Sequence, residues 1–301
     1  MKPFYSLVTL FIMTTIFSKS MASEQTAIDA PNQFVTAGAN KIAYRTIGKG
    51  KPMILCNRFR GILDSWDPAF LDELAKTNQL IIFDYPGIGL SSGQLPPEIL
   101  GVASAVKDLA DALKIDKFNL VGWSFGGAVA QTFAANFPGR ATHLILIGAN
   151  PPGKNEKPLE QAFLDAAFKP VNDLKDEEVL FFEPAVPASV AAAKASNERI
   201  AARKKDRSIE VTPDKFQDYF KGVGDYQADS YGSRGKLATT PTPILILSGD
   251  HDPSCPVENW YPLVKKWKTA QLVVIPNSGH GVQHEFPKYC TDIMQLFIAN
   301  R

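Results

Sequence analysis

Six short apolar runs recur along this chain, and they constrain its fold more than any other feature. They alternate with stretches of helical pattern and cover residues 53–56, 80–83, 118–121, 144–147, 244–247 and 272–275. Runs that are apolar at every position are typical of parallel strands with both faces covered by helices. Residues 33–48 read as an antiparallel hairpin turning at residues 38–40. The sequence therefore predicts an α/β fold with a mostly parallel, eight-stranded sheet flanked by helices.

One long interval lacks this alternation of apolar runs and helical stretches. Residues 151–242 contain no comparable run and read as several helices. We therefore expect a core in two parts, residues 23–150 and 243–301, with a helical cap inserted between them. Aromatic clusters in the cap, at residues 163–168 and 179–182, either cover an apolar pocket or simply pack one helix on another. The Ala-rich, basic stretch 188–207 is interpreted as a solvated helix face.

The N-terminal segment has the pattern of an export signal. Lys2 is followed by a mostly apolar run over residues 4–17, and Ser20 and Ala22 are small residues at the spacing of a cleavage site. We expect a signal peptide over residues 1–22, cleaved after Ala22, and a mature protein that is secreted or periplasmic. A membrane anchor would need about 20 apolar residues, so no stable membrane insertion is expected after cleavage.

The charge balance of the chain limits the kinds of molecule that we expect it to bind. The chain has 32 Lys and Arg against 31 Asp and Glu, which gives no basic excess for nucleic acid or another polyanion. A small-molecule substrate is therefore favoured, and the oligomeric state is left open.

Three cysteines, Cys56, Cys255 and Cys290, leave at least one unpaired within the chain, and a Cys255–Cys290 disulfide is an open alternative.

The segment around Ser124 predicts a nucleophile. Ser124 follows an apolar strand, precedes a helical run over residues 128–137, and lies between Gly122 and Gly126 in a G-x-S-x-G pattern. A sharp strand-to-helix turn holds the serine in a strained conformation and needs small residues two positions away on each side. The Phe125 N–H, at the helix N-terminus, could donate to an oxyanion.

Roughly residues 33–300, which are nearly all of the mature chain, resemble the α/β-hydrolase superfamily, especially its serine esterase, lipase and cofactor-free haloperoxidase-like branch. His280 lies in a segment similar to the family's G-H-x-x-x-x-E-x-P and is the implied base. Asp252 lies in a segment similar to G-x-x-D-x-x-x-P and is the implied acid, with Asp250 as the alternative. The triad order Ser, Asp, His is the one typical of this fold.

The oxyanion loop departs from the family. Where the family carries His-Gly-x, this chain has Asn57, Arg58 and Phe59, and the resemblance implies the Phe59 backbone N–H as the second oxyanion donor. Arg58 puts a long cation near the site. Arg58 and Arg60 either bind a substrate carboxylate or make structural ion pairs.

These residues predict acyl transfer without a cofactor or metal. We expect attack by Ser124 on a small to medium carboxylic ester, with water activated by His280 releasing the acid. Lactonase, carbon–carbon bond hydrolase, aminopeptidase and perhydrolase activities use the same triad and stay open. The alternative from another class is a protein of this fold that binds a ligand without turning it over.

Overall fold

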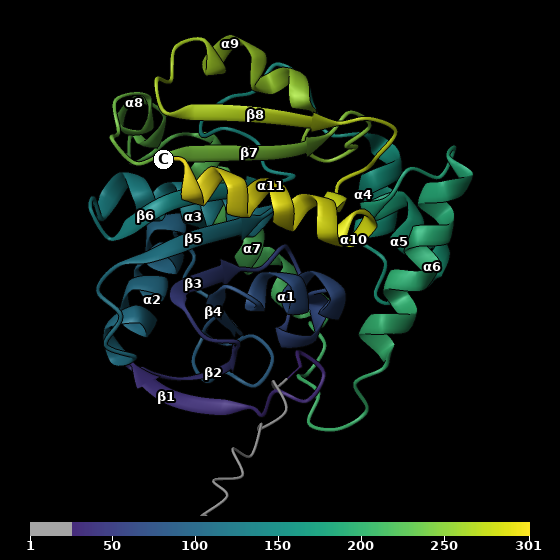
Figure 1. Cartoon of the computed structure of the whole chain (residues 1–301), viewed down its shortest axis with the longest axis horizontal. Helices are drawn as coiled ribbons and strands as arrows, with labels where there is room; N and C mark the ends of the chain where they lie inside the picture. The colour runs from purple at the N-terminus through teal and green to yellow at the C-terminus, as the bar shows by residue number, and fades with distance from the viewer. Residues whose placement is uncertain (1–25) are drawn as a thin grey trace, which may run out of the picture.

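The computed structural model describes residues 26–301, and the predicted signal peptide lies outside them. Within this range, one eight-stranded sheet runs through the molecule in the order β1-β2-β4-β3-β5-β6-β7-β8 (Figure 1). The strands are β1 (Gln33–Ala37), β2 (Asn40–Ile47), β3 (Lys51–Cys56), β4 (Asn78–Phe83), β5 (Phe118–Trp123), β6 (Ala141–Ile147), β7 (Ile244–Gly249) and β8 (Ala270–Ile275).

All six apolar runs form strands, which confirms the predicted sheet. β3 to β8 pair in parallel with their neighbours, whereas β1 and β2 form the predicted antiparallel hairpin and β2 joins β4 antiparallel. The expectation of burial on both faces is wrong for β8. This strand lies at the edge, with Gln271 and Val274 exposed, because it has a neighbour on one side only and less covering structure.

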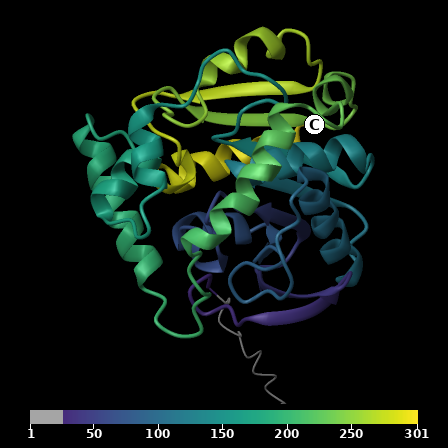
Figure 2. The same cartoon turned by 180° about the vertical axis from the view of Figure 1, so that it is seen from behind.

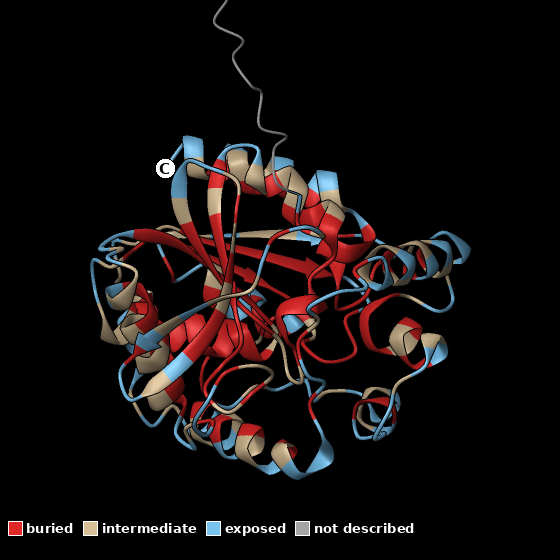
Figure 3. Ribbon diagram, turned by 90° about the horizontal axis from the view of Figure 1, so that it is seen from below, coloured by how far each residue is buried: buried red, intermediate tan, exposed pale blue. Residues whose placement is uncertain are grey.

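Helices cover the sheet on two sides, as Figures 1 and 2 show. The helices of the chain are α1 (Pro68–Ala75), α2 (Ile99–Ala112), α3 (Phe125–Asn136), α4 (Gln161–Ala167), α5 (Leu174–Phe181), α6 (Pro187–Ala201), α7 (Phe216–Gln227), α8 (Ser233–Ala238), α9 (Tyr261–Val264), α10 (Val282–Glu285) and α11 (Pro287–Ala299). One buried apolar cluster joins α2, α3 and α7 to the sheet, and a second joins α1 and α11 to its opposite face. Figure 3 shows the central strands buried between these layers.

α4 to α8 follow one another between β6 and β7, in the interval where the sequence predicted only helices. α4 to α6 stand at one end of the sheet (Figure 1), and α7 crosses the face seen in Figure 2. The interpretation of residues 188–207 as a solvated face holds for the exposed Lys194, Lys204 and Lys205 but is wrong for Arg199 and Arg203. Arg199 pairs with Asp67 at 2.6 Å, and Arg203 donates to the carbonyl of Ala30 at 2.9 Å. These arginines fasten α6 and the turn after it to the core.

Three further findings concern the cysteines, the start of α1 and the helix lengths. All three cysteines, Cys56, Cys255 and Cys290, are free and buried, so the disulfide alternative is wrong. Asp67 caps α1, accepting from the Ala69 N–H at 2.9 Å. Among residues 26–301, no helix is both long enough and apolar enough to traverse a bilayer.

Candidate active site

Ser124 lies at a sharp turn between β5, which ends at Trp123, and α3, which begins at Phe125. Its φ of 56° and ψ of −118° fall in a strained region for a residue with a side chain. The neighbouring glycines are required by close contacts. A Cβ on Gly122 would lie 2.2 Å from the Gly126 carbonyl oxygen, and one on Gly126 would lie 2.0 Å from that of Cys56. The local geometry is that of a nucleophile elbow.

His280 and Asp252 form a buried pair. His280 follows β8 and Asp252 follows β7, so the parallel strands bring both to the same edge of the sheet as Ser124. His280 Nδ1 lies 2.9 and 2.8 Å from the two carboxylate oxygens of Asp252. Asp252 Oδ1 also accepts from the backbone N–H groups of Ser254 and Cys255 at 2.9 and 2.7 Å. This carboxylate is thus fixed as an acceptor, and it fixes Nδ1 as the protonated nitrogen, leaving Nε2 to act as a base.

The alternative acid is placed elsewhere. Asp250 Oδ1 accepts from the Ser278 N–H at 3.3 Å and lies 3.0 Å from His251 Nδ1, at the surface. Asp250, His251 and Asp252 therefore do not converge on one point. Asp252 instead lies within 4.8 Å of Cys255 and His280. Burial raises the pKa of the Cys255 thiol, which disfavours the thiolate that a metal would need, and the Asp252–His280 hydrogen bond accounts for the cluster.

The remaining histidines have other surroundings. His284 is buried, its Nε2 accepts from the Asp67 N–H at 3.2 Å, and burial lowers its pKa to about 4. His143 bonds Asn119 on the adjacent strand at 2.8 Å. His251 is exposed beside Asp250. Neutral, structural roles fit His284 and His143.

Phe59 and Phe125 both line a pocket with Ser124. Within residues 26–301, the backbone N–H of neither residue donates to a protein acceptor outside the helices and strands. The loop that carries Phe59 is fixed by Asn57, whose Nδ2 donates to the Ile62 carbonyl at 2.7 Å and whose own carbonyl accepts from Tyr85 at 3.1 Å. The loop thus holds an unpaired N–H beside the elbow despite the missing His-Gly.

Arg58 and Arg60 have different environments. The Arg60 guanidinium donates to the carbonyls of Ala167, Lys169 and Pro170 at 3.1, 2.8 and 3.0 Å. These carbonyls end α4, so Arg60 ties the oxyanion loop to the inserted helices. Arg58 forms no ion pair with any described residue; its Nη1 donates to the Phe59 carbonyl at 2.8 Å.

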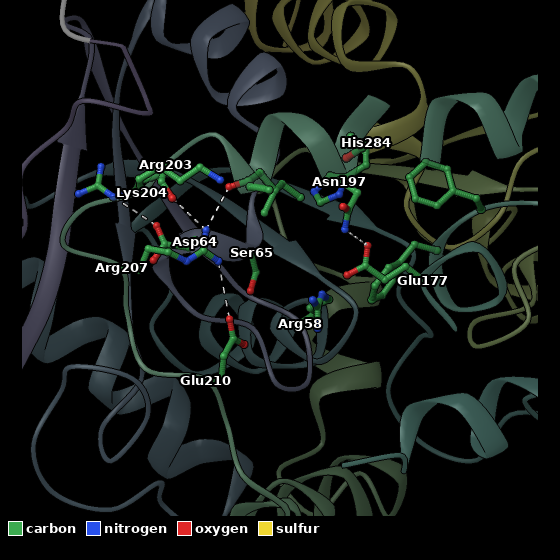
Figure 4. A pocket seen from close by; sticks show the side chains of 15 residues that line it. Arg58, Asp64, Ser65, Glu177, Asn197, Arg203, Lys204, Arg207, Glu210 and His284 are labelled. Carbon is green, nitrogen blue, oxygen red and sulfur yellow. Dashed lines mark hydrogen bonds and ion pairs between the residues drawn. The ribbon is translucent and has the colours of Figure 1, made fainter. Parts of the chain in front are cut away.

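Three cavities meet around these residues. The catalytic cavity, of about 20 Å³, is lined by Ser124, His280, Arg58 and Phe181. The apolar pocket, of about 250 Å³, opens beside Ser124 and is lined by Phe125, Phe163, Phe168, Phe220 and Tyr226. The polar pocket, of about 390 Å³, lies beyond Arg58 and Phe181 (Figure 4). The aromatic cluster at residues 163–168 therefore lines a pocket next to the nucleophile.

Sequence reasoning did not connect two aromatic residues, Trp123 and Phe181, with His280. Trp123 Nε1 donates to the His280 carbonyl at 3.1 Å, and the Phe181 ring stacks on the His280 ring at 6.4 Å between centroids. Trp123 stands next to Ser124 in the sequence, and this adjacency was the available signal. Phe181 belongs to the aromatic cluster at residues 179–182, but its contact with His280 depends on how α5 packs and left no signal in the sequence.

Comparison with known proteins identifies the family of this chain. Residues 51–287 match the model of a family described as the alpha/beta hydrolase fold. The chain belongs to this family. The α/β hydrolase is similar to 2-hydroxy-6-oxo-2,4-heptadienoate hydrolase of Pseudomonas putida, with 28% identity over 89% of this chain and 96% of that protein. It is also similar to poly(3-hydroxyalkanoate) depolymerase of Ectopseudomonas oleovorans, with 27% identity over 76% of this chain and 77% of that one.

A solved structure matches nearly the whole molecule. The alpha/beta hydrolase fold protein from Chitinophaga pinensis superposes with a TM-score of 0.81 and 25% identity, covering 92% of this chain and all of that one. The family and these relatives identify the chain as a hydrolase.

Proposed function

We propose that this α/β hydrolase cleaves small to medium carboxylic esters through Ser124, His280 and Asp252. The observation that carries the proposal is the buried His280–Asp252 pair, with both carboxylate oxygens within 2.9 Å of Nδ1, whose His280 lines a cavity together with Ser124. A base held in one tautomer beside a serine is the arrangement that activates a hydroxyl.

In this mechanism, Ser124 Oγ attacks the ester carbonyl while its proton passes to His280 Nε2. The backbone N–H groups of Phe59 and Phe125 donate to the oxyanion that develops. His280 then protonates the leaving alcohol, and the acyl-enzyme remains. Water, deprotonated by His280, attacks the acyl carbon and releases the acid and the free Ser124. Asp252 stabilises the imidazolium during both steps.

The pocket dimensions suggest the acyl group. A volume of about 250 Å³ with aromatic walls suits a short to medium apolar chain. Hydrolysis of p-nitrophenyl esters of increasing acyl length should therefore peak at short or medium chains and fall toward background with hexadecanoate. A panel in which no ester exceeds the Ser124→Ala background would overturn the ester proposal.

A carbon–carbon bond hydrolase is the second candidate. The Pseudomonas putida relative, which the chain covers over 96% of its length, is named for a keto acid substrate rather than an ester. The same triad would serve either bond. Turnover of 2-hydroxy-6-oxo-2,4-heptadienoate, followed by loss of the absorbance of its conjugated chain, separates the two: faster cleavage of this compound than of any ester would favour the second candidate.

We further propose that the protein is exported and cleaved after Ala22. The support is the sequence pattern of residues 1–22 alone, with Lys2, an apolar run, and small residues before the cleavage position. N-terminal sequencing of the protein expressed from its full gene should begin at Ser23. An N-terminus at Met1 would contradict export by this route.

A further inference from the structure

Arg58 is a half-buried cation without an acidic partner among the described residues. Arg45, Arg199 and Arg203 each lie within 3.5 Å of a carboxylate oxygen, whereas Arg58 has no such contact among the described residues. Its Nε is buried and has no hydrogen-bond partner. Its guanidinium carbon lies 4.5 Å from the ring centroid of Phe181 and 5.3 Å from that of Trp123. Aromatic faces stabilise the charge only in part.

The charge of Arg58 persists at neutral pH. Burial lowers the pKa of this guanidinium to about 10, and the more distant acids Glu177 and Glu210 counteract part of that shift. The group is therefore protonated under ordinary conditions. A protonated guanidinium whose Nε is buried without a hydrogen-bond partner destabilises the free protein unless an acceptor completes it. Because this unused donor of Arg58 lies beside Ser124, we interpret Arg58 as a residue that binds a ligand rather than one that stabilises the fold.

The acids near Arg58 are engaged by other groups. The polar pocket of Figure 4 carries three carboxylates, and each has another partner: Asp64 with Arg45 and Arg203, Glu177 with Asn197, and Glu210 with Arg207. Figure 4 shows Arg58 apart from these pairs, pointing into the space between them. An anion entering from the substrate side would meet Arg58 without displacing a protein carboxylate.

The position of His280 indicates which end of the substrate meets Arg58. His280 lines the catalytic cavity together with Arg58 but does not line the apolar pocket. Because His280 must protonate the leaving group, that group lies in the catalytic cavity. The acyl chain then occupies the apolar pocket on the other side of Ser124. Arg58 and Phe181 also line the polar pocket, which gives a longer leaving group further room.

We propose that Arg58 binds a carboxylate on the leaving group, so that the preferred substrate is a monoanion: an apolar acyl chain esterified to a short hydroxycarboxylate. Attack by Ser124 forms the Oγ–carbon bond and breaks the ester carbon–oxygen bond. The Ser124 proton passes through His280 to the departing oxygen, and the hydroxycarboxylate leaves. This inference rests on the proposed ester hydrolysis, but the binding step is testable without it.

The test compares two ligands of nearly equal size, one anionic and one neutral. Butanoyloxyacetate carries a carboxylate where butanoyloxyacetamide carries a neutral amide. Calorimetric titration of the Ser124→Ala protein measures binding without turnover, so failure of catalysis does not affect the result. We expect the carboxylate to bind about tenfold tighter or more, as for a charge-assisted hydrogen bond in a confined site. Equal binding of the two ligands overturns the proposal.

Substitution of Arg58 assigns the preference to this residue. In the Ser124→Ala background, Arg58→Gln should abolish the preference for the carboxylate, and Arg58→Lys should retain part of it. Lys205 provides the matched control, because it is exposed and follows Lys204 in the sequence but does not itself line the polar pocket. Lys205→Gln removes the same charge and should leave the preference intact. If Arg58→Gln weakens both ligands equally, or if the preference survives it, Arg58 is not the binding group. With Arg58 intact, the ligand comparison stands even if Arg58→Gln does not fold.

Discussion

Gly126→Ala separates the two elements that carry the oxyanion donors. The added Cβ would lie 2.0 Å from the Cys56 carbonyl oxygen and 2.7 Å from that of Asn57. Carbon and oxygen atoms that are not bonded need about 3 Å or more. The start of α3 and the end of β3 must therefore move apart by about 1 Å. Phe125 is the first residue of α3, and Phe59 follows β3 by three positions.

A displacement of this size should be more harmful to catalysis than to folding. Misplacement of catalytic groups by about 1 Å costs on the order of 100-fold in rate, and overpacking costs about 1–3 kcal/mol of stability. We therefore expect Gly126→Ala to hydrolyse p-nitrophenyl butanoate on the order of 100-fold more slowly while remaining folded. Steady-state kinetics and urea unfolding of the same preparation measure the two effects.

Gly224→Ala is the matched control. Gly224 lies in α7, and a Cβ there meets nothing within 4 Å. Alanine is the better helix former, so this variant should keep its activity and gain about 0.5–1 kcal/mol. The reasoning is refuted if Gly126→Ala hydrolyses the ester within a few-fold of the wild-type rate, because the contact with Cys56 would then not control the donors.

Three further substitutions test the account. Asp252→Asn replaces the acceptor of the His280 Nδ1 proton and should lower kcat on the order of 10³–10⁴-fold without unfolding the protein; steady-state kinetics would contradict this with a loss below tenfold. Arg60→Gln removes donors to three carbonyls and should destabilise the protein by about 1–3 kcal/mol in urea unfolding. An unchanged urea midpoint would show that these hydrogen bonds do not stabilise the fold. Burial raises the pKa of Glu285 from 4.5 to about 7, so its ionisation destabilises the fold as the pH rises through that window. Glu285→Gln should therefore stabilise the protein by up to about 3 kcal/mol more at about pH 8 than at about pH 4, and equal effects at both values would refute the shift.

The sheet was predictable because burial of a strand on both faces produces a recognisable pattern in the local sequence. A parallel strand between two helical layers needs apolar residues at consecutive positions, and each such run in the chain formed a strand. The edge strand β8 carries the same apolar pattern, yet Val274 is exposed. Its sequence does not record how many neighbours it has, and only the order of strands in the sheet determines that number.

The site was predictable where function depends on position along the chain. Ser124, Asp252 and His280 each follow a strand, and parallel strands bring their carboxyl ends to one edge. The roles of arginines were not predictable, because an arginine's partner is set by packing between distant segments. Arg60 reaches the end of α4, about 107 positions away along the chain, whereas Arg58, two residues earlier, stacks on Phe181 instead.

Labelling with a fluorophosphonate probe tests the central claim most directly, because only an activated serine is phosphonylated rapidly. The account predicts rapid labelling of the wild-type protein, none in Ser124→Ala, and strongly slowed labelling in His280→Ala. A folded wild-type protein that does not react, or one that still reacts after Ser124→Ala, would contradict it. In the first case the fold would bind a ligand without chemistry at Ser124, and in the second the nucleophile would lie elsewhere.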